Sequence, residues 1–330
     1  MEQLCFSATH KDEKIEKNSS SGGAFTAITD AWFSEHGEDA VVYGCILDEN
    51  LDAKHIRAPS KEERNRMRGS KYVASDITGI YGQVKADMEQ GLFVAFSGTP
   101  CQIAGLLQAL KNGCVYQEQQ LLTIEVICNG VGSNAFFKDY IAHLEKRYKG
   151  KAISCNFRGK SRAGSSTCME IEFDNGKRFA SPSTRFDWFY SAYCRNYILR
   201  SSCFDCKFTT LERNADISLA DMRKKDPSAA IEGKSLVFVN SKKGHLWADK
   251  GFAQMKVAPA FVEELDQPHL YAPCSKPSGY DLFWEIYKKQ GYLAAQRYLG
   301  NNTLKGRVKS FVAKVLNGLH IATLVKKILG

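Results

Sequence analysis

The chain has 330 residues, of which 44% are apolar and 25% are charged, so it can bury a sizeable core in one large or two ordinary domains. This composition excludes a disordered chain, a collagen-like chain and a small disulfide-stapled fold. The formal net charge of +9 equals the number of Lys and Arg residues that follow Glu285, and no Asp or Glu occurs after that residue. The rest of the chain is therefore neutral, which disfavours a nucleic-acid-binding protein.

No stretch of the sequence has the roughly 18 uncharged apolar residues that a membrane-spanning helix needs. Residues 1–18 mix Lys with Asp and Glu, where a signal peptide would be apolar. We therefore expect a cytoplasmic protein. Its eleven cysteines then favour metal, cluster or redox chemistry over a disulfide framework. Cys45 and Cys168 lie in apolar strand-like runs and are expected to be buried packing residues.

The first half of the chain alternates between helical and strand-like hydrophobic patterns. Helices are predicted at 22–33, 80–90, 101–110 and 134–148, and strands at 40–47, 92–96 and 121–128. Such alternation predicts an α/β fold with a largely parallel or mixed sheet that is covered by helices.

The pattern changes after about residue 150. Strands are predicted at 153–157, 168–173, 177–180, 216–220 and 235–240, with a hairpin turn at Asp174-Asn175-Gly176, and helices at 244–254 and 280–298. We expect a mixed β element here and a C-terminal amphipathic helix. The predicted organisation is an N-terminal extension (1–18), an α/β part (19–150), a C-terminal part with a Cys-x-x-Cys motif (151–300) and a basic tail (301–330).

Two cysteines are predicted at one edge of the sheet. In Ser97-Gly98-Thr99-Pro100-Cys101, Thr99 is a candidate N-cap and Pro100 the first helical residue, so Cys101 begins a helix. The free N–H groups there favour a thiolate or could hold a phosphate. Cys128 ends the next predicted strand and should emerge at the same carboxyl edge. The alternatives are a tight turn with a packing cysteine, and a buried last residue of a strand.

The motif Cys203-Phe204-Asp205-Cys206 has the spacing that lets two sulfurs reach one metal ion or one cluster. Half of a zinc site, a dithiol pair and chance all remain open for a single motif of this kind. With Cys101 and Cys128 the set reaches four thiolates, the number that a [4Fe–4S] cluster takes.

Two loops have residues suited to phosphate binding. Ser19-Ser20-Ser21-Gly22-Gly23 precedes a helix and offers small residues with exposed N–H groups, although it matches no standard phosphate-loop spacing and could be a flexible N-cap. Arg68-Gly69-Ser70-Lys71-Tyr72 combines two cations, a hydroxyl group and an aromatic ring, a set that can clamp phosphates and cover a flat ring. Without context it would be an ordinary loop.

Taken in order, these segments resemble the beta-subunit family of coenzyme F420 hydrogenase/dehydrogenase, the flavin and iron–sulfur module of F420-reducing hydrogenase. The matching segments are 19–25, 42–44, 67–73, 96–106, 127–131, 156–158, 200–208 and 215–221.

This resemblance implies FAD held by the α/β part, a [4Fe–4S] cluster, and electron transfer between flavin, cluster and an external donor or acceptor. It makes Cys101, Cys128, Cys203 and Cys206 the expected cluster ligands. The expected flavin contacts are Ser20, Ser21, Gly22, Gly23, Arg68, Ser70, Lys71, Tyr72, Ser97, Gly98, Thr99 and Pro100. No catalytic residue is assigned.

The sequence departs from the family pattern in three places. Many members begin with a two-cluster ferredoxin segment, whereas this chain has only Cys5 there, so a separate electron carrier such as a ferredoxin or a redox subunit is expected. Asn129 stands where the family has His. Met222-Arg223-Lys224 replaces Phe-Trp-Gly and removes an aromatic pair from an expected cofactor edge.

These departures leave the substrate open, including whether it is F420. Relatives of the short form resemble proteins encoded among surface-polysaccharide biosynthesis functions in bacteria. The alternative function is a non-redox accessory protein that keeps the scaffold and binds zinc or no cofactor.

Apolar residues between about 304 and 329 follow helical spacing, and no acidic residue lies among them. This pattern predicts a basic amphipathic helix that rests peripherally on a membrane surface or docks on a partner. The alternative is that the helix packs on the protein's own body.

Overall fold

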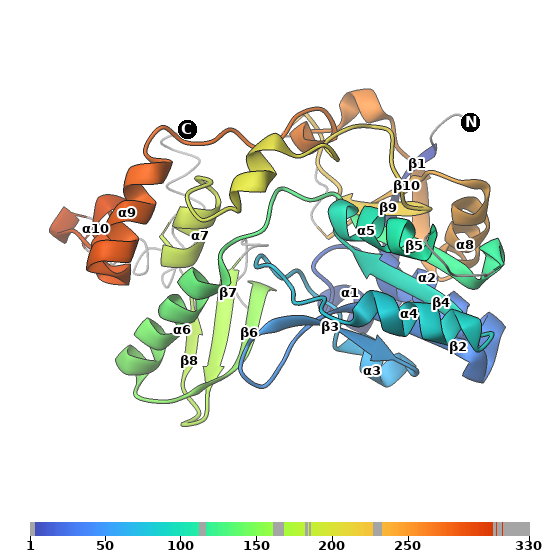
Figure 1. Ribbon diagram of the computed structural model, residues 1–330, viewed down its shortest axis with the longest axis horizontal. Coiled ribbons are helices and arrows are strands. Elements are labelled where there is room, and N and C mark those ends of the chain that lie inside the picture. The colour runs from blue at the N-terminus through green and yellow to red at the C-terminus, as the bar shows by residue number, and fades with distance from the viewer. Residues whose placement is uncertain are drawn as a thin grey trace.

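The computed structural model describes residues 4–111, 117–160, 168–181, 184, 186–226, 233–305, 308 and 312. They form two lobes, one around an eight-stranded sheet and one around a three-stranded sheet (Figure 1). The fold class is the predicted one: a mixed α/β fold with a large helix-covered sheet and a second, smaller β element.

The large sheet has a parallel centre and antiparallel margins. Its strands are, in spatial order, β11 (Met255–Pro259), β1 (Leu4–His10), β10 (Ser235–Val239), β9 (Ile217–Asp221), β5 (Leu121–Val126), β4 (Phe93–Gly98), β2 (Ala40–Leu47) and β3 (Ala53–Ala58). Strands β9, β5, β4 and β2 run parallel. The carboxyl ends of these four strands therefore meet at one edge, as the sequence predicted for β4 and β5.

Helices cover both faces of this sheet (Figure 1). Helices α2 (Ala24–His36) and α8 (Lys242–Phe252) pack on one face, and α4 (Ile80–Glu89) and α5 (Pro100–Lys111) on the other. Successive residues of β2 point to opposite faces, so Val42 packs toward α2 while Val41 and Tyr43 pack toward α4 and α5. Burial on both faces explains the continuous apolar run at 40–47.

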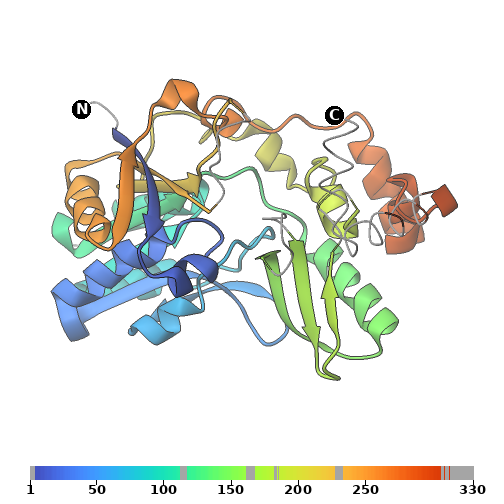
Figure 2. The ribbon, with the colours of Figure 1, turned by 180° about the vertical axis from the view of Figure 1, so that it is seen from behind.

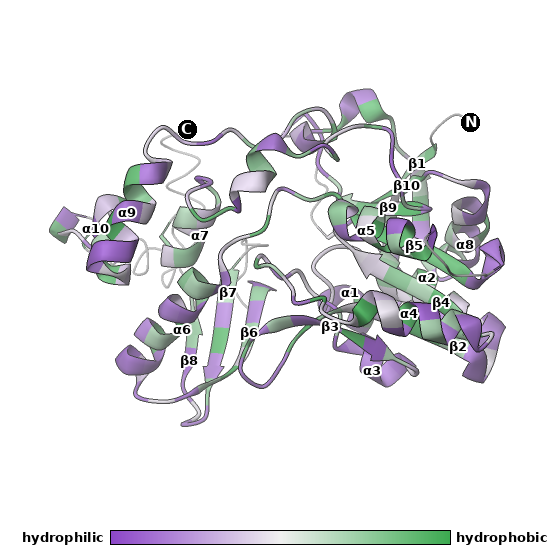
Figure 3. Cartoon of the chain, in the orientation of Figure 1, coloured by the Kyte–Doolittle hydropathy of each residue, from purple (hydrophilic) through white to green (hydrophobic). Residues whose placement is uncertain are grey.

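The smaller lobe contains an antiparallel sheet and an aromatic core. Its elements are β6 (Ala152–Gly159), β7 (Cys168–Phe173), β8 (Arg178–Ala180), α6 (Asn134–Tyr148), α7 (Trp188–Tyr193), α9 (Tyr280–Gln290) and α10 (Tyr292–Tyr298). Strand β7 alternates hydrophobic and hydrophilic residues (Figure 3) because only one of its faces meets the core. The predicted turn joins β7 to β8, with Gly176 in the left-handed region at φ 76°.

Two predictions need correction. The single helix expected at 280–298 is two helices, since Gly291 adopts φ 79° and ends α9. Residues 4–10, which were placed in an N-terminal extension, form β1 inside the large sheet. The short helices α1 (Glu13–Lys17) and α3 (Lys61–Asn65) were not predicted.

The amphipathic helix predicted at about 304–329 in the basic tail lies almost entirely outside the described residues. In the described ranges, no helix is both long enough and apolar enough to cross a membrane.

Candidate functional site

The carboxyl edge of the large sheet borders a cavity of about 710 Å³. Loops that follow β4 and β5, the end of β9 and the segment after α3 supply much of its lining. Ten of the twelve predicted flavin contacts line this cavity: Ser20, Ser21, Gly23, Arg68, Ser70, Lys71, Tyr72, Ser97, Gly98 and Thr99. The structure thus brings together three segments that are far apart in the sequence.

The other two predicted contacts, Gly22 and Pro100, do not line the cavity. A Cβ atom on Gly22 would lie 2.1 Å from the carbonyl oxygen of Ala8 and 2.7 Å from the amide nitrogen of Ser235. Gly22 is therefore needed for close packing of the loop against β1 and β10. Pro100 is buried as the first residue of α5, the helical position predicted for it.

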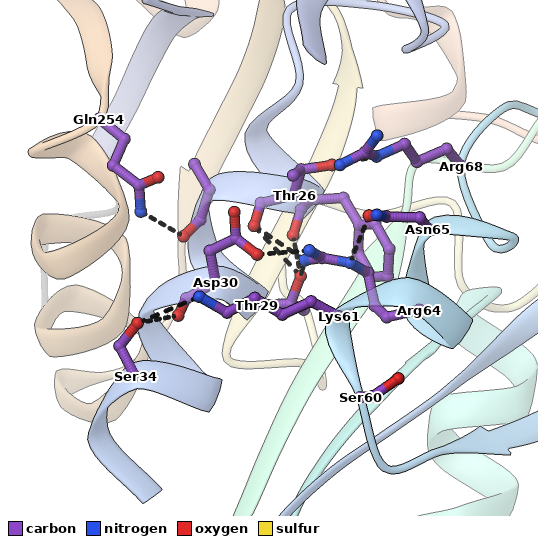
Figure 4. Close-up of polar contacts among 12 residues, drawn as sticks. Thr26, Thr29, Asp30, Ser34, Ser60, Lys61, Arg64, Asn65, Arg68 and Gln254 are labelled. Atoms are coloured by element: carbon purple, nitrogen blue, oxygen red, sulfur yellow. Dashed lines mark hydrogen bonds and ion pairs between the residues drawn. The ribbon is translucent and has the colours of Figure 1, made fainter. Parts of the chain in front are cut away.

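Arg68 is held in place by α2 (Figure 4). Arg64 of α3 is buried, ion-paired with Asp30 and hydrogen-bonded to the carbonyl of Thr26, which fixes α3 against α2. Arg68 then donates from Nε to the hydroxyl of Thr26 at 3.0 Å. Within the described part of the chain this is the only hydrogen bond from its guanidinium group, so the Nη groups can serve a ligand.

Lys71 has a different environment from the one that the sequence suggested. Its ammonium group donates three hydrogen bonds, to the carbonyl oxygens of Met67 (2.8 Å), Arg68 (3.0 Å) and Gly69 (3.0 Å). Burial lowers the pKa of Lys71 to about 8. All three N–H groups are already used, so Lys71 can contribute charge to the cavity but no free donor.

Hydrogen bonds between serines join two of the loops. The hydroxyl oxygen of Ser20 accepts hydrogen bonds from the amide (2.7 Å) and the hydroxyl (3.0 Å) of Ser70. The ring of Tyr72 packs on Tyr193 and Phe157 of the smaller lobe, with centroids 5.0 and 5.7 Å away. Both lobes therefore take part in building the cavity.

The Cys-x-x-Cys segment lies directly against the loop that carries Cys128. Arg200 donates its amide to the carbonyl of Val131 at 3.0 Å. Gly130, at φ 100°, makes this approach possible, because a Cβ atom there would lie 3.0 Å from Leu199 and 3.3 Å from the Cβ of Cys203.

The four predicted cluster ligands lie in one neighbourhood. Burial, followed by smaller contributions from the charges of Cys203, Cys101 and Cys206, raises the pKa of Cys128 to about 12. Burial likewise raises the pKa of Cys203, with contributions from Cys206 and Cys101. Cys101 is exposed, and its sulfur lies 3.2 Å from the Thr99 hydroxyl oxygen. Thiols that disfavour one another's charge suit a positively charged metal group, which would compensate four thiolates.

No three His, Cys, Asp or Glu side chains in the described ranges are arranged to hold a single metal ion. A [4Fe–4S] cluster makes a different demand, since each of its irons takes its own thiolate and the sulfurs stand further apart. The donor set of four cysteines fits that group.

Sequence reasoning missed several residues of this region. Cys274 donates from its sulfur to the carbonyl of Asn129 at 2.9 Å, and burial together with Cys203 and Cys206 raises its pKa to about 11. No motif surrounds Cys274, so nothing in the sequence marked it. Cys168 is fully buried as expected, whereas Cys45 lines the cavity.

Further cavity-lining residues were not predicted as site residues: His55, Arg158, Asp221, Arg223 and Gln267. Arg158 and Asp221 lie in segments that carry the family resemblance, which was the one signal that could have found them.

A comparison with curated proteins found no match to the chain. A comparison with solved structures agrees with this architecture. A chain from the xenon-derivatized F420-reducing [NiFe] hydrogenase complex of Methanosarcina barkeri matches with a TM-score of 0.53 and 20% identity, over 89% of this chain and 90% of that chain. At that identity the match shows a shared fold.

Two family models match the sequence. One describes the N-terminal part of the coenzyme F420 hydrogenase/dehydrogenase beta subunit and matches residues 5–80. The other describes the C-terminal part of the same subunit and matches residues 93–260, more than half of the chain. The chain therefore belongs to the coenzyme F420 hydrogenase/dehydrogenase beta-subunit family.

Proposed function

We propose that this protein is an FAD-dependent iron–sulfur oxidoreductase that passes electrons between a [4Fe–4S] cluster, a flavin and an external donor or acceptor. The observation that carries the proposal is that Cys101 and Cys128 line the same cavity as Arg68, Tyr72 and Ser97. Residues suited to a cluster and residues suited to a flavin thus border one space. Membership of a family named for oxidoreductase subunits supports this reading.

Different residues of the cavity are suited to different parts of the flavin. The serine loop offers small groups and N–H donors, and Arg68 offers a cation with free Nη groups, which together suit a pyrophosphate. The Ser97 to Thr99 turn adds small residues to the cavity wall, although the amide of Thr99 already donates to Oε1 of Gln102 at 2.9 Å. Tyr72 supplies a ring for a flat surface. A bound flavin would supply two-electron and one-electron exchange, and a cluster one-electron exchange. The cavity volume lies within the range of roughly 300–1,000 Å³ that is typical of ligand sites.

The external redox partner is a separate electron carrier, such as a ferredoxin or a redox subunit. Cys101 is exposed, so a carrier can approach the cluster ligands from solvent at this residue. The small-molecule substrate is either related to F420 or belongs to surface-polysaccharide biosynthesis.

Anaerobic purification of the full chain, followed by a visible spectrum and by iron, sulfide and flavin analysis, tests this function. We expect a brown protein with about four irons and one FAD per chain. A protein that stays colourless and free of iron after anaerobic reconstitution contradicts the proposal and favours the non-redox accessory role.

A further inference from the structure

We propose that Arg158, Asp221 and Arg223 form a seat for an anionic group, a phosphate or a carboxylate, in the wall of the cavity. The three residues come from different parts of the chain. Arg158 lies in β6 of the smaller lobe, Asp221 ends β9 of the large sheet, and Arg223 follows β9. All three line the cavity.

The pairing within this seat leaves positive charge unbalanced. Arg158 forms an ion pair through Nη1 with Oδ2 of Asp221, and Nη2 of Arg223 approaches the same oxygen at 3.7 Å. The other carboxylate oxygen, Oδ1, accepts a hydrogen bond from the hydroxyl of Ser21. Two guanidinium groups therefore share one carboxylate, and the seat has a net charge of +1.

The Nε–H group of Arg158 also has no hydrogen-bond acceptor among the described residues. The side chain of Arg158 is only 10% exposed, and its Nε is buried. A buried charge without a full set of partners is unfavourable, and the negative charge of an anion in the cavity would compensate the guanidinium group of Arg158. The guanidinium fork matches the paired oxygens of phosphate and carboxylate.

The rest of the cavity wall is also positively charged. Among its described residues, five Lys or Arg side chains face only two carboxylates, those of Asp76 and Asp221. His55 adds no charge at neutral pH, because burial lowers its pKa to about 4.

Arg223 is the one member of the seat that departs from the family pattern. Met222 and Arg223 stand where an aromatic pair was expected. Met222 is buried in the core, whereas Arg223 is 53% exposed at the side chain and lines the cavity. Of the two replacements, Arg223 is the one that can contact a ligand.

Binding of inorganic pyrophosphate to the purified full chain, measured by calorimetry, tests the seat. Losing a charge-assisted contact should weaken binding about tenfold or more in Arg223→Gln. Lys225→Gln is the matched control, since it removes the same charge from an exposed residue two positions away that does not line the cavity. Arg158→Gln is a weaker test, because Arg158 also joins the two lobes.

The anion has two possible sources, the pyrophosphate of the flavin, which the adjoining Ser21 loop would hold, and a separate substrate. The choice between them rests on the proposed function. If Arg223→Gln weakens FAD binding and leaves riboflavin binding unchanged, the seat holds the cofactor. If flavin-loaded protein still binds pyrophosphate through Arg223, the seat holds the substrate.

Two outcomes separate the seat from the proposed function. The seat is overturned if the Arg223→Gln variant binds pyrophosphate as tightly as the Lys225→Gln variant does, and also binds FAD as tightly. Arg223-dependent binding of pyrophosphate by a chain that takes up no flavin sustains the seat and removes the flavin function.

Discussion

Replacement of Cys203 or Cys206 by Ser is expected to lower the bound iron from about four atoms per chain to less than about one. A hydroxyl group is a poor substitute for a thiolate, and the two sulfurs come from one short turn whose preceding residue, Arg200, is hydrogen-bonded to the Cys128 loop. Iron and sulfide analysis of the variants after anaerobic reconstitution measures the effect.

Two further cysteines serve as controls for that series. Cys168→Ser should keep its iron, since the Cys168 sulfur is fully buried in the smaller lobe and donates to the carbonyl of Ser181. Cys274→Ser should also keep it, because Cys274 is bonded to Asn129 and lies outside the predicted ligand set. Full iron in the Cys203 and Cys206 variants, or its loss from Cys274→Ser, would contradict the assignment.

Lys71 and Arg68 are expected to respond differently to replacement by Ala. Lys71→Ala leaves three carbonyl oxygens without their donor, so we expect a loss of about 2–3 kcal/mol in the free energy of unfolding of the flavin-free protein. Arg68→Ala should weaken FAD binding about 10- to 150-fold, because the free Nη groups are lost. Urea unfolding and flavin titration distinguish the two, and the reverse pattern would show that Lys71 holds the phosphate.

At the scale of elements, the local hydrophobic pattern predicted the strands at the centre of the large sheet. The range 40–47 was predicted with the bounds of β2 because it is a continuous apolar run with polar flanks, and α6 with its bounds because its helical periodicity is unbroken. Strand β1 was missed, since its partners β10 and β11 follow it by more than 200 residues. Strand β3 was missed because it is a short antiparallel strand at the sheet margin with polar residues such as Lys54 and Arg57.

The N-cap of α7 gives this element an unusual dependence on pH. Asp187 accepts hydrogen bonds from the amide of Tyr190 and the hydroxyl of Tyr140, and burial raises its pKa from 3.8 to about 6. The folded chain therefore holds a proton that the unfolded chain has already released between about pH 4 and 6. This contribution to stability is greatest below that window and is lost as pH rises through it, by about 3 kcal/mol.

Asp187→Asn cannot ionise and should remove this dependence. Relative to the wild type, the variant should gain up to about 3 kcal/mol of unfolding free energy between pH 4 and pH 7. Urea unfolding at both values measures it. A constant difference between the two proteins would mean that Asp187 is ionised in the fold throughout.

At the scale of the whole molecule, His55 of the large sheet opposes this effect. Its Nε2 lies 3.0 Å from the carbonyl oxygen of Ser97, and burial lowers its pKa from 6.5 to about 4. Its contribution is present above pH 6.5 and is lost as pH falls toward 4, by about 3 kcal/mol. His55→Asn should therefore gain stability relative to the wild type on acidification, the opposite of Asp187→Asn. The same unfolding series checks the sign, and parallel curves would show that His55 does not titrate differently on folding.

The candidate site depends on contacts between lobes that no local pattern encodes. Arg158 and Asp221 are 63 residues apart and pair across the two sheets. Lys160 of the smaller lobe bonds to Glu16 of α1. Figure 2 shows the two lobes from behind. Sequence spacing identified the thiols and the phosphate-type loops, because their chemistry is local. The net charge of the cavity wall followed only from the topology.

Because both lobes line the cavity, FAD should protect both from hydrogen exchange. A bound ligand stabilises the native state by RT ln(1 + [L]/Kd), which is about 2.7 kcal/mol at a ligand concentration of 100 times Kd. The same increment in free energy slows the exchange of every amide that exchanges only when the lobes separate. We expect slower exchange in the 66–76 segment of the large lobe and in β6 of the smaller one, which carries Arg158. Riboflavin is the matched control: it lacks the phosphates that Arg68 and the serine loop are proposed to hold, so its protection should be weaker at equal concentration. Protection confined to the 66–76 segment, with β6 unchanged by FAD, would mean that the smaller lobe borders the cavity without contributing to binding.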